Sequence, residues 1–195
     1  MALANIISAF GLAGAAGLNA YIPLLIVAVL GRLGVLQLSQ PFDVLTSWPA
    51  IAALVVLLII EFVVDKVPGA DHINDAIQTF VRPAAGAILF AANTGVIQGI
   101  DPVVSLIAGL VLALSVHATK AAVRPAVNLT TMGIGAPFVS AAEDILSAIA
   151  SFLAIFAPVL FVLFALSVGF VAFRLYRKVR QLRKPKPNDV ATIPS

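Results

Sequence analysis

The feature that most constrains this chain is a series of six long stretches without Asp, Glu, Lys or Arg. They cover residues 1–31, 44–60, 83–100, 102–119, 125–142 and 145–173. A helix needs about 20 apolar residues to cross the hydrocarbon core of a bilayer. The stretches also lack the two-residue alternation of membrane β-strands. We therefore predict an all-α fold: a polytopic transmembrane helical bundle of about six spans, with some segments broken or re-entrant.

Composition excludes most soluble classes. Of the 195 residues, 61% are hydrophobic and only 11% are charged, whereas a soluble domain carries about 25% charged residues. This excludes a water-soluble globule, a disordered chain and a nucleic-acid-binding domain. The chain has no cysteine, so disulfide and thiolate chemistry do not arise. The first basic residue is Arg32, so we interpret residues 1–31 as a mature segment rather than a cleaved signal peptide.

Glycine and proline predict where the helices break. We expect helices over 3–34, 48–66, 83–98, 102–120, 125–146 and 147–175, with a short helix over 72–80 capped by Asp71. The first segment is too long for one plain span, and we expect a break near Gly17-Leu18-Asn19. Gly133, Gly135 and Pro137 also interrupt the fifth segment, so either segment could be a re-entrant pair.

Charge divides the chain into two parts. Residues 174–195 hold seven basic residues and one acidic residue, a net charge of +6, while residues 1–173 hold five basic and eight acidic residues, a net charge of −3. We assign 1–175 to a transmembrane domain and 176–195 to a basic cytoplasmic tail with a disordered end. The tail is expected to contact anionic lipid headgroups of the bilayer, and no nucleic acid.

Basic residues cluster on the cytoplasmic side of membrane proteins. With the tail inside and six spans, the connections that carry Lys66 with Arg82 and Lys120 with Arg124 also lie inside, and only Arg32 lies outside. This predicts a multi-pass protein with a cytoplasmic N-terminus and a cytoplasmic C-terminus.

One four-residue pattern occurs twice. Residues 81–84 (Val-Arg-Pro-Ala) recur at 123–126, and each copy is expected to begin a helix, because proline suits a first turn. A duplicated hairpin, 48–98 and 102–146, would explain the echo, as would chance in a chain rich in Ala and Val. Because both copies are expected to start outward-running segments, the repeat would be parallel.

Charged and polar side chains inside a membrane domain are costly and therefore point to function. Between the second and third segments lies an acidic cluster that could bind a hard cation or relay protons. The alternative is an interfacial loop whose carboxylates pair with the nearby basic residues. The cluster consists of Glu61, Asp65, Asp71, His72 and Asp75.

Basic groups complete the candidate binding site. Arg82 and Arg124 precede prolines at expected helix starts, where they could clasp a phosphate or carboxylate; ion pairing or membrane anchoring is the alternative. His117, Lys120 and Arg124 share nearly one helix face, and His117 could relay protons or simply hydrogen-bond between helices.

Two further features are weaker. The pair Glu143-Asp144 is expected to cap the last segment, and becomes a site only if the fifth segment is re-entrant. Common enzymatic motifs are absent from the sequence, although Asp71 and Asp75 share the spacing of one diphosphate-binding aspartate pair of membrane prenyl transferases. We assign no catalytic residue and no cofactor, and leave metal binding open.

Three runs carry a family resemblance. They are 14–25 (GAAGLNAYIPLL), 61–82 with its D-K-x-P-G-x-D-x-x-N-D pattern, and 81–87 (VRPAAGA). Together they resemble the bacterial family of small integral membrane proteins known as domain of unknown function DUF4126, over about residues 3–175. The resemblance implies a polytopic protein of the bacterial inner (cell) membrane, and implies no activity, cofactor or ligand.

The residues thus lead to three functional hypotheses. The first is a small transporter or channel-like permease, because broken helices lie beside intramembrane charges. The second is a membrane-embedded enzyme acting on a phosphorylated lipid. The third is a structural or assembly factor that uses its basic tail.

Overall fold

The computed structural model describes residues 2–64, 71–94, 100–131 and 135–182. Within these ranges every regular element is a helix, which confirms the all-α prediction. The elements are α1 (Ala2–Leu18), α2 (Tyr21–Arg32), the 3-10 helix η1 (Phe42–Thr46), α3 (Trp48–Val64), α4 (Asp71–Thr94), α5 (Pro102–Thr131), α6 (Ala136–Phe156) and α7 (Pro158–Leu182).

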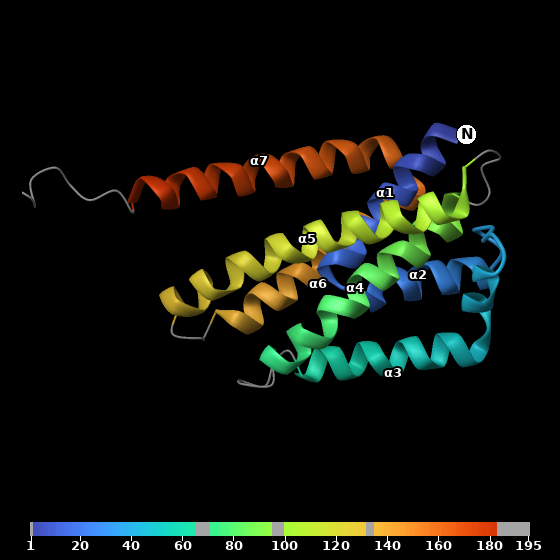
Figure 1. The fold of residues 1–195 in the computed structure, drawn as a ribbon, viewed down its shortest axis with the longest axis horizontal. Helices are drawn as coiled ribbons and strands as arrows, with labels where there is room; N and C mark the ends of the chain where they lie inside the picture. The colour runs from blue at the N-terminus through green and yellow to red at the C-terminus, as the bar shows by residue number, and fades with distance from the viewer. Residues whose placement is uncertain (1, 65–70, 95–99, 132–134, 183–195) are drawn as a thin grey trace, which may run out of the picture. The chain divides into compact units, whose positions relative to one another are not determined.

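The chain forms two compact units, Met1–Phe161 and Val162–Ser195. In the first unit, α1 and α2 form a hairpin that enters the bundle and returns to the same end (Figure 1). Near the start of α1, the Asn5 carbonyl accepts a hydrogen bond of 2.9 Å from Asn93 Nδ2. After α2, the Ser39 N–H donates to the Ala92 carbonyl over 3.1 Å. Both ends of the hairpin therefore lie beside the C-terminal end of α4.

The break between α1 and α2 follows from the local sequence. Asn19 Oδ1 accepts the backbone N–H groups of Tyr21 and Ile22 at 2.9 and 3.0 Å, which caps α2. Pro23 has no N–H to donate to the Asn19 carbonyl, which together with the Asn19 cap favours a break at this point. The break lies where the glycine pattern placed it, near residue 19.

The hairpin corrects one part of the expected topology. The N-terminus was expected on the same side of the membrane as the connection between α3 and α4. Instead, Asn5 lies at the end of α4 marked by Asn93, opposite the end where α4 begins at Asp71. The difference arises because the capped break at Asn19 reverses the chain.

Two prolines do not begin helices. Pro83 lies inside α4 and Pro125 inside α5, so neither copy of the repeated motif starts a segment. Helices α4 and α5 are also antiparallel. Arg82 on α4 contacts His117 on α5. One turn further along α4, a Cβ on Gly86 would meet Ala113, which lies one turn before His117 in α5. The copies therefore have opposite directions rather than the expected shared one. Interior prolines are tolerated in membrane helices because neighbouring groups satisfy the freed carbonyls.

The later helix boundaries also differ from expectation. The sequence predicts a connection at Lys120 and Arg124, but α5 continues to Thr131, and α6 runs from Ala136 to Phe156. Lys120 does not need water because it is buried against Glu143. The next break lies at Ala157–Pro158 instead of residue 147.

Small residues allow the helices around the hairpin to pack closely. Gly86 on α4 and Gly109 on α5 leave no room for a Cβ between the two backbones. Gly17 on α1 is similarly close to the backbone of Ala113. Such small-residue contacts are typical of helix packing in membranes. They bring α1, α4 and α5 close enough for polar side chains to meet across the bundle.

The outer surface is strongly apolar. Large hydrophobic side chains are exposed on α3, α5 and α6, among them Ile59, Phe62, Ile107 and Phe152. Two helical stretches, Pro102–Ala122 and Pro137–Phe156, are long and apolar enough to cross a membrane, and four shorter apolar helices accompany them in the described ranges.

The second unit contains most of α7. Most of its described apolar side chains, such as Leu166 and Phe170, are exposed. Toward the C-terminal end, Arg174 lies over the Phe170 ring at 5.0 Å and Arg177 over the Phe173 ring at 5.8 Å. Residues 183–195, the greater part of the expected tail, lie outside the described residues.

Candidate functional site

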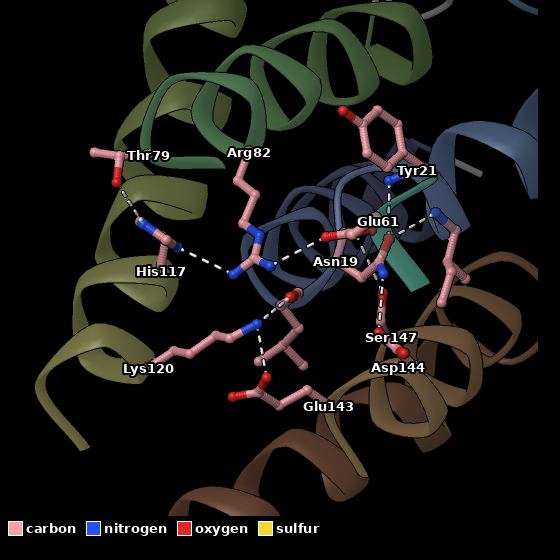
Figure 2. Close-up of polar contacts among 12 residues, drawn as sticks. Asn19, Tyr21, Glu61, Thr79, Arg82, His117, Lys120, Glu143, Asp144 and Ser147 are labelled. Carbon is pink, nitrogen blue, oxygen red and sulfur yellow. Dashed lines mark hydrogen bonds and ion pairs between the residues drawn. The ribbon is translucent and has the colours of Figure 1, made fainter. Parts of the chain in front are cut away.

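A chain of polar side chains, buried except for Thr79 at its end, joins α3, α4 and α5. Arg82 Nη2 donates to Glu61 Oε1 over 3.2 Å, and Arg82 Nη1 contacts His117 Nδ1 at 3.2 Å. The other ring nitrogen of His117, Nε2, lies 3.1 Å from Thr79 Oγ1. Figure 2 shows Arg82 reaching between His117 and Glu61. The chain thus runs from Glu61 through Arg82 and His117 to Thr79.

The geometry assigns the proton on His117. A guanidinium can only donate hydrogen bonds, so Nδ1 of His117 accepts from Arg82 and carries no proton. The neutral imidazole then carries its proton on Nε2 and donates it to Thr79. A second proton on His117 would have to take the place of the bond to Arg82, so the contact between them depends on the charge of the ring.

The charged groups of this chain are almost completely buried. Arg82, Glu61 and His117 are 0%, 3% and 4% exposed. Removing an ion pair from water costs as much as, or more than, the attraction between the charges returns. Stability alone therefore does not account for this pair, which favours a functional role.

A second group of charges surrounds the tip of the hairpin. Lys120 Nζ lies 2.6 Å from Glu143 Oε2 on α6 and donates to the Leu18 carbonyl over 3.0 Å. Beside it, Asn19 Nδ2 donates to Asp144 Oδ1 over 2.9 Å. Lys120 and Asp144 thus contact consecutive residues at the break between α1 and α2 (Figure 2).

The two broken helix ends contribute partial charges of their own. The last carbonyls of α1 form its negative end, and they accept Lys120 at Leu18 and the Ser147 hydroxyl at Ala15, over 3.0 Å in each case. The first N–H groups of α2 form a positive end that Asn19 caps. Discontinuous helices whose ends meet near the middle of a bundle are a common way to build ion and substrate sites.

An apolar groove of about 350 Å³ opens beside this group. Its lining combines one acidic side chain, that of Asp144, with apolar residues of α2 and α3. The apolar lining consists of Ile22, Leu58, Ile59, Phe62 and Val63.

The structure brings together four of the side chains proposed from the sequence: Glu61, Arg82, His117 and Lys120. The backbones of Asp71, His72, Asp75 and Arg124 lie in α4 and α5, but their side chains, like all of Asp65, lie outside the described residues. The cation and diphosphate hypotheses that rest on Asp65, Asp71 and Asp75 therefore stay predictions. Among the side chains that the structure describes, no three His, Cys, Asp or Glu residues gather as a metal site.

Two expectations about individual residues are corrected. Arg82 was placed at a helix start, but it lies within α4 and its guanidinium is engaged by Glu61 and His117. Glu143-Asp144 was expected to cap a helix, but the pair lies inside α6 and contacts Lys120 and Asn19. The cap is not formed because α6 continues past residue 147 to Phe156.

The sequence analysis did not identify the buried polar face of α6. Glu143, Ser147 and Ser151 follow at intervals of four residues, so they share one helix face. All three are buried, and this face lies against α1, where Ser147 reaches Ala15. The four-residue spacing of small polar side chains was the signal that could have identified this face.

Family membership follows from comparison with known protein families. A family model described as a domain of unknown function (DUF4126) matches residues 6–178. The chain belongs to the DUF4126 family. The matched region includes every side chain of both polar groups. No curated protein and no solved structure matches the chain. The functional conclusion for this DUF4126 protein therefore rests on the site itself.

Proposed function

We propose that this protein is a small membrane transporter, a permease that moves protons through Glu61, Arg82 and His117 with or without a transported solute. The observation that carries the proposal is the buried Glu61–Arg82–His117 chain beside the broken ends of α1 and α2. Ionisable groups within apolar bundles mark ion pathways and proton relays. Broken helices supply the fixed partial charges that such sites use.

Two further observations support a membrane setting with several spans. Exposed apolar patches of this extent are rare on soluble monomers, and here they occur on α3, α5 and α6. Pro102–Ala122 and Pro137–Phe156 have the length and composition of spans. We propose that α3 to α7 cross the membrane and that α1 and α2 form a re-entrant hairpin from one side.

The contacts of His117 favour a proton as the transported ion. Its Nδ1 accepts from Arg82 and its Nε2 donates to Thr79. His117 can therefore take a second proton only by giving up its contact with Arg82, so a bound proton would change the contacts of the chain.

Proton flux into proteoliposomes tests this proposal. With a potassium diffusion potential and a pH-sensitive dye inside the vesicles, the unsubstituted protein should admit protons faster than empty vesicles do. Glu61→Gln and His117→Asn should each slow this flux by at least about tenfold, as expected when a group that transfers protons is removed. The matched control is Asp43→Asn, because Asp43 is exposed in η1, away from both polar groups.

Two results would contradict the proposal. One is a flux no greater than that of empty vesicles with well-folded protein, as judged by gel filtration. The other is full flux in both Glu61→Gln and His117→Asn.

We further propose an orientation based on the positive-inside rule. Lys66 follows α3 in the sequence, and Arg124 lies in the last two turns of α5, toward the end of the bundle where α4 begins. We assign this end to the cytoplasm and the N-terminus to the opposite side. The basic residues after Phe173 support a cytoplasmic C-terminus for α7.

Single cysteines test this orientation, because the chain has none of its own. In intact cells an impermeant maleimide should label Asp43→Cys, and should label Asn188→Cys only after the membrane is opened. We expect anionic lipid to slow labelling at position 188, because each basic residue near such a surface contributes about 1 kcal/mol of attraction. Labelling of Asn188→Cys in intact cells would reverse the assignment.

A further inference from the structure

Two buried polar atoms on α4 face the inside of the protein without a partner. Among the described residues, neither the Nε–H of Arg82 nor Oε1 of Gln78 has a hydrogen-bond partner. Arg82 is 0% exposed and Gln78 is 1% exposed. A buried donor or acceptor left unsatisfied costs about 1–3 kcal/mol. An unpaired donor and an unpaired acceptor on one helix can both be satisfied by a single bound molecule.

Helix geometry places the two side chains together. Gln78 and Arg82 are four residues apart, so they lie on consecutive turns of one face of α4, with about 5–6 Å between their Cβ atoms. The Tyr21 side chain, at the start of α2, is hydrogen-bonded to the Gln78 side chain and interacts electrostatically with Arg82. The pair therefore lies beside the break in the hairpin, next to Glu61.

The two unpaired atoms define the chemistry of the bound molecule. This molecule must accept a hydrogen bond from Arg82 Nε and donate one to Gln78 Oε1. The charge of Arg82 is already compensated by Glu61 at 3.2 Å, and an added anion would leave an unpaired negative charge in a medium of low dielectric constant. The bound molecule is therefore neutral.

We propose that Arg82 and Gln78 bind a small neutral solute through a carboxylic acid or carboxamide group. Such a group carries an acceptor oxygen and a donor O–H or N–H on one edge, so a single group satisfies both protein atoms. The inference rests on the proposed function and names the solute class of that site. A carboxylic acid binds in this form as a carboxylate together with its proton, which agrees with proton coupling.

Three molecules of nearly equal size test this site. Acetamide and acetic acid carry both a donor and an acceptor, whereas acetone carries only the acceptor. We expect acetamide, and acetic acid in acidic buffer, to raise the unfolding temperature of the purified full-length protein. At roughly ten times the Kd, the shift should be about 3 °C, and acetone should cause none. Comparing acetamide with acetic acid shows which of the two groups is preferred.

Substitutions locate the binding. Gln78→Met removes the acceptor at nearly constant volume, and Arg82→Lys keeps the charge but removes the Nε–H donor. Both should abolish the shift. Gln37→Met is the matched control, because Gln37 is exposed after α2, and it should retain the full shift.

Three results would overturn the inference: an acetone shift equal to that of acetamide, an undiminished shift in Gln78→Met, or no shift with either donor–acceptor molecule. The last result would mean that water, not a solute, satisfies the two atoms. Proton flux is measured without any of these solutes, so a failure here leaves the proposed transport function standing. A failure of the flux test likewise does not alter the binding result.

Discussion

Replacing Arg82 by methionine is expected to lower the free energy of unfolding by about 3–5 kcal/mol. The substitution leaves the carboxylate of Glu61, which is 3% exposed, without its guanidinium partner. It also removes the donor to Nδ1 of His117. Reversible unfolding in mixed micelles, followed by circular dichroism, measures the loss.

The double variant Glu61→Met with Arg82→Met separates the loss of the ion pair from the change in side-chain volume. Replacing both members of a buried ion pair by apolar residues is often neutral or stabilising, so this variant should recover most of the stability while losing proton flux. Arg32→Met is the surface control. Arg32 is exposed, donates to the Thr46 carbonyl and lies over Trp48, so its loss should cost about 1 kcal/mol or less. A cost below about 1 kcal/mol for Arg82→Met would contradict the burial of this pair.

Replacing Gly109 by alanine should destabilise the bundle by about 3 kcal/mol, the upper part of the usual range for overpacking. A Cβ at this position would overlap the Gly86 carbonyl oxygen and Phe90 Cβ on α4. Because one obstacle is backbone, α4 and α5 would have to separate. That separation would also lengthen the contact between Arg82 and His117, so proton flux should fall together with stability.

Gly14→Ala provides the matched control. Gly14 also lies within a helix, but apart from its own helix backbone no described atom lies within 4 Å of the position its Cβ would take. Alanine should be neutral there, or stabilising by roughly 0.5–1 kcal/mol, because it removes the entropic cost of glycine in a helix. Equal effects of Gly109→Ala and Gly14→Ala would show that the close contact between α4 and α5 is not present.

The sequence predicted the class of fold and several boundaries correctly. The break near Asn19 and the starts at Trp48 and Pro102 all lie where the pattern placed them. These features depend on local physics, since glycine, proline and capping side chains act within a few residues. Pro83 was misread because a proline that begins a helix and a proline within one have the same sequence signature, and only neighbouring helices decide between them.

The candidate site was only partly predictable. Glu61, Arg82, His117 and Lys120 were identified because charge and histidine are rare within apolar segments. Which groups pair was not predictable, because Glu61 lies 21 residues from Arg82 and Lys120 lies 23 from Glu143. The roles of Asn19 and Gln78 were not predicted either, because uncharged polar residues are common in helix–helix contacts.

The sequence by itself determined that this chain forms apolar helices, that the first of them breaks near Asn19, and that its few charges lie within a region of low polarity. These properties depend on composition and short-range spacing. The tertiary structure alone decided that the first segment returns to its starting side, that α4 and α5 are antiparallel, and that the charges form a connected chain. Those outcomes depend on contacts between distant segments, where close backbone approach at Gly86 and Gly109 and mutual neutralisation of buried charge select one arrangement from many.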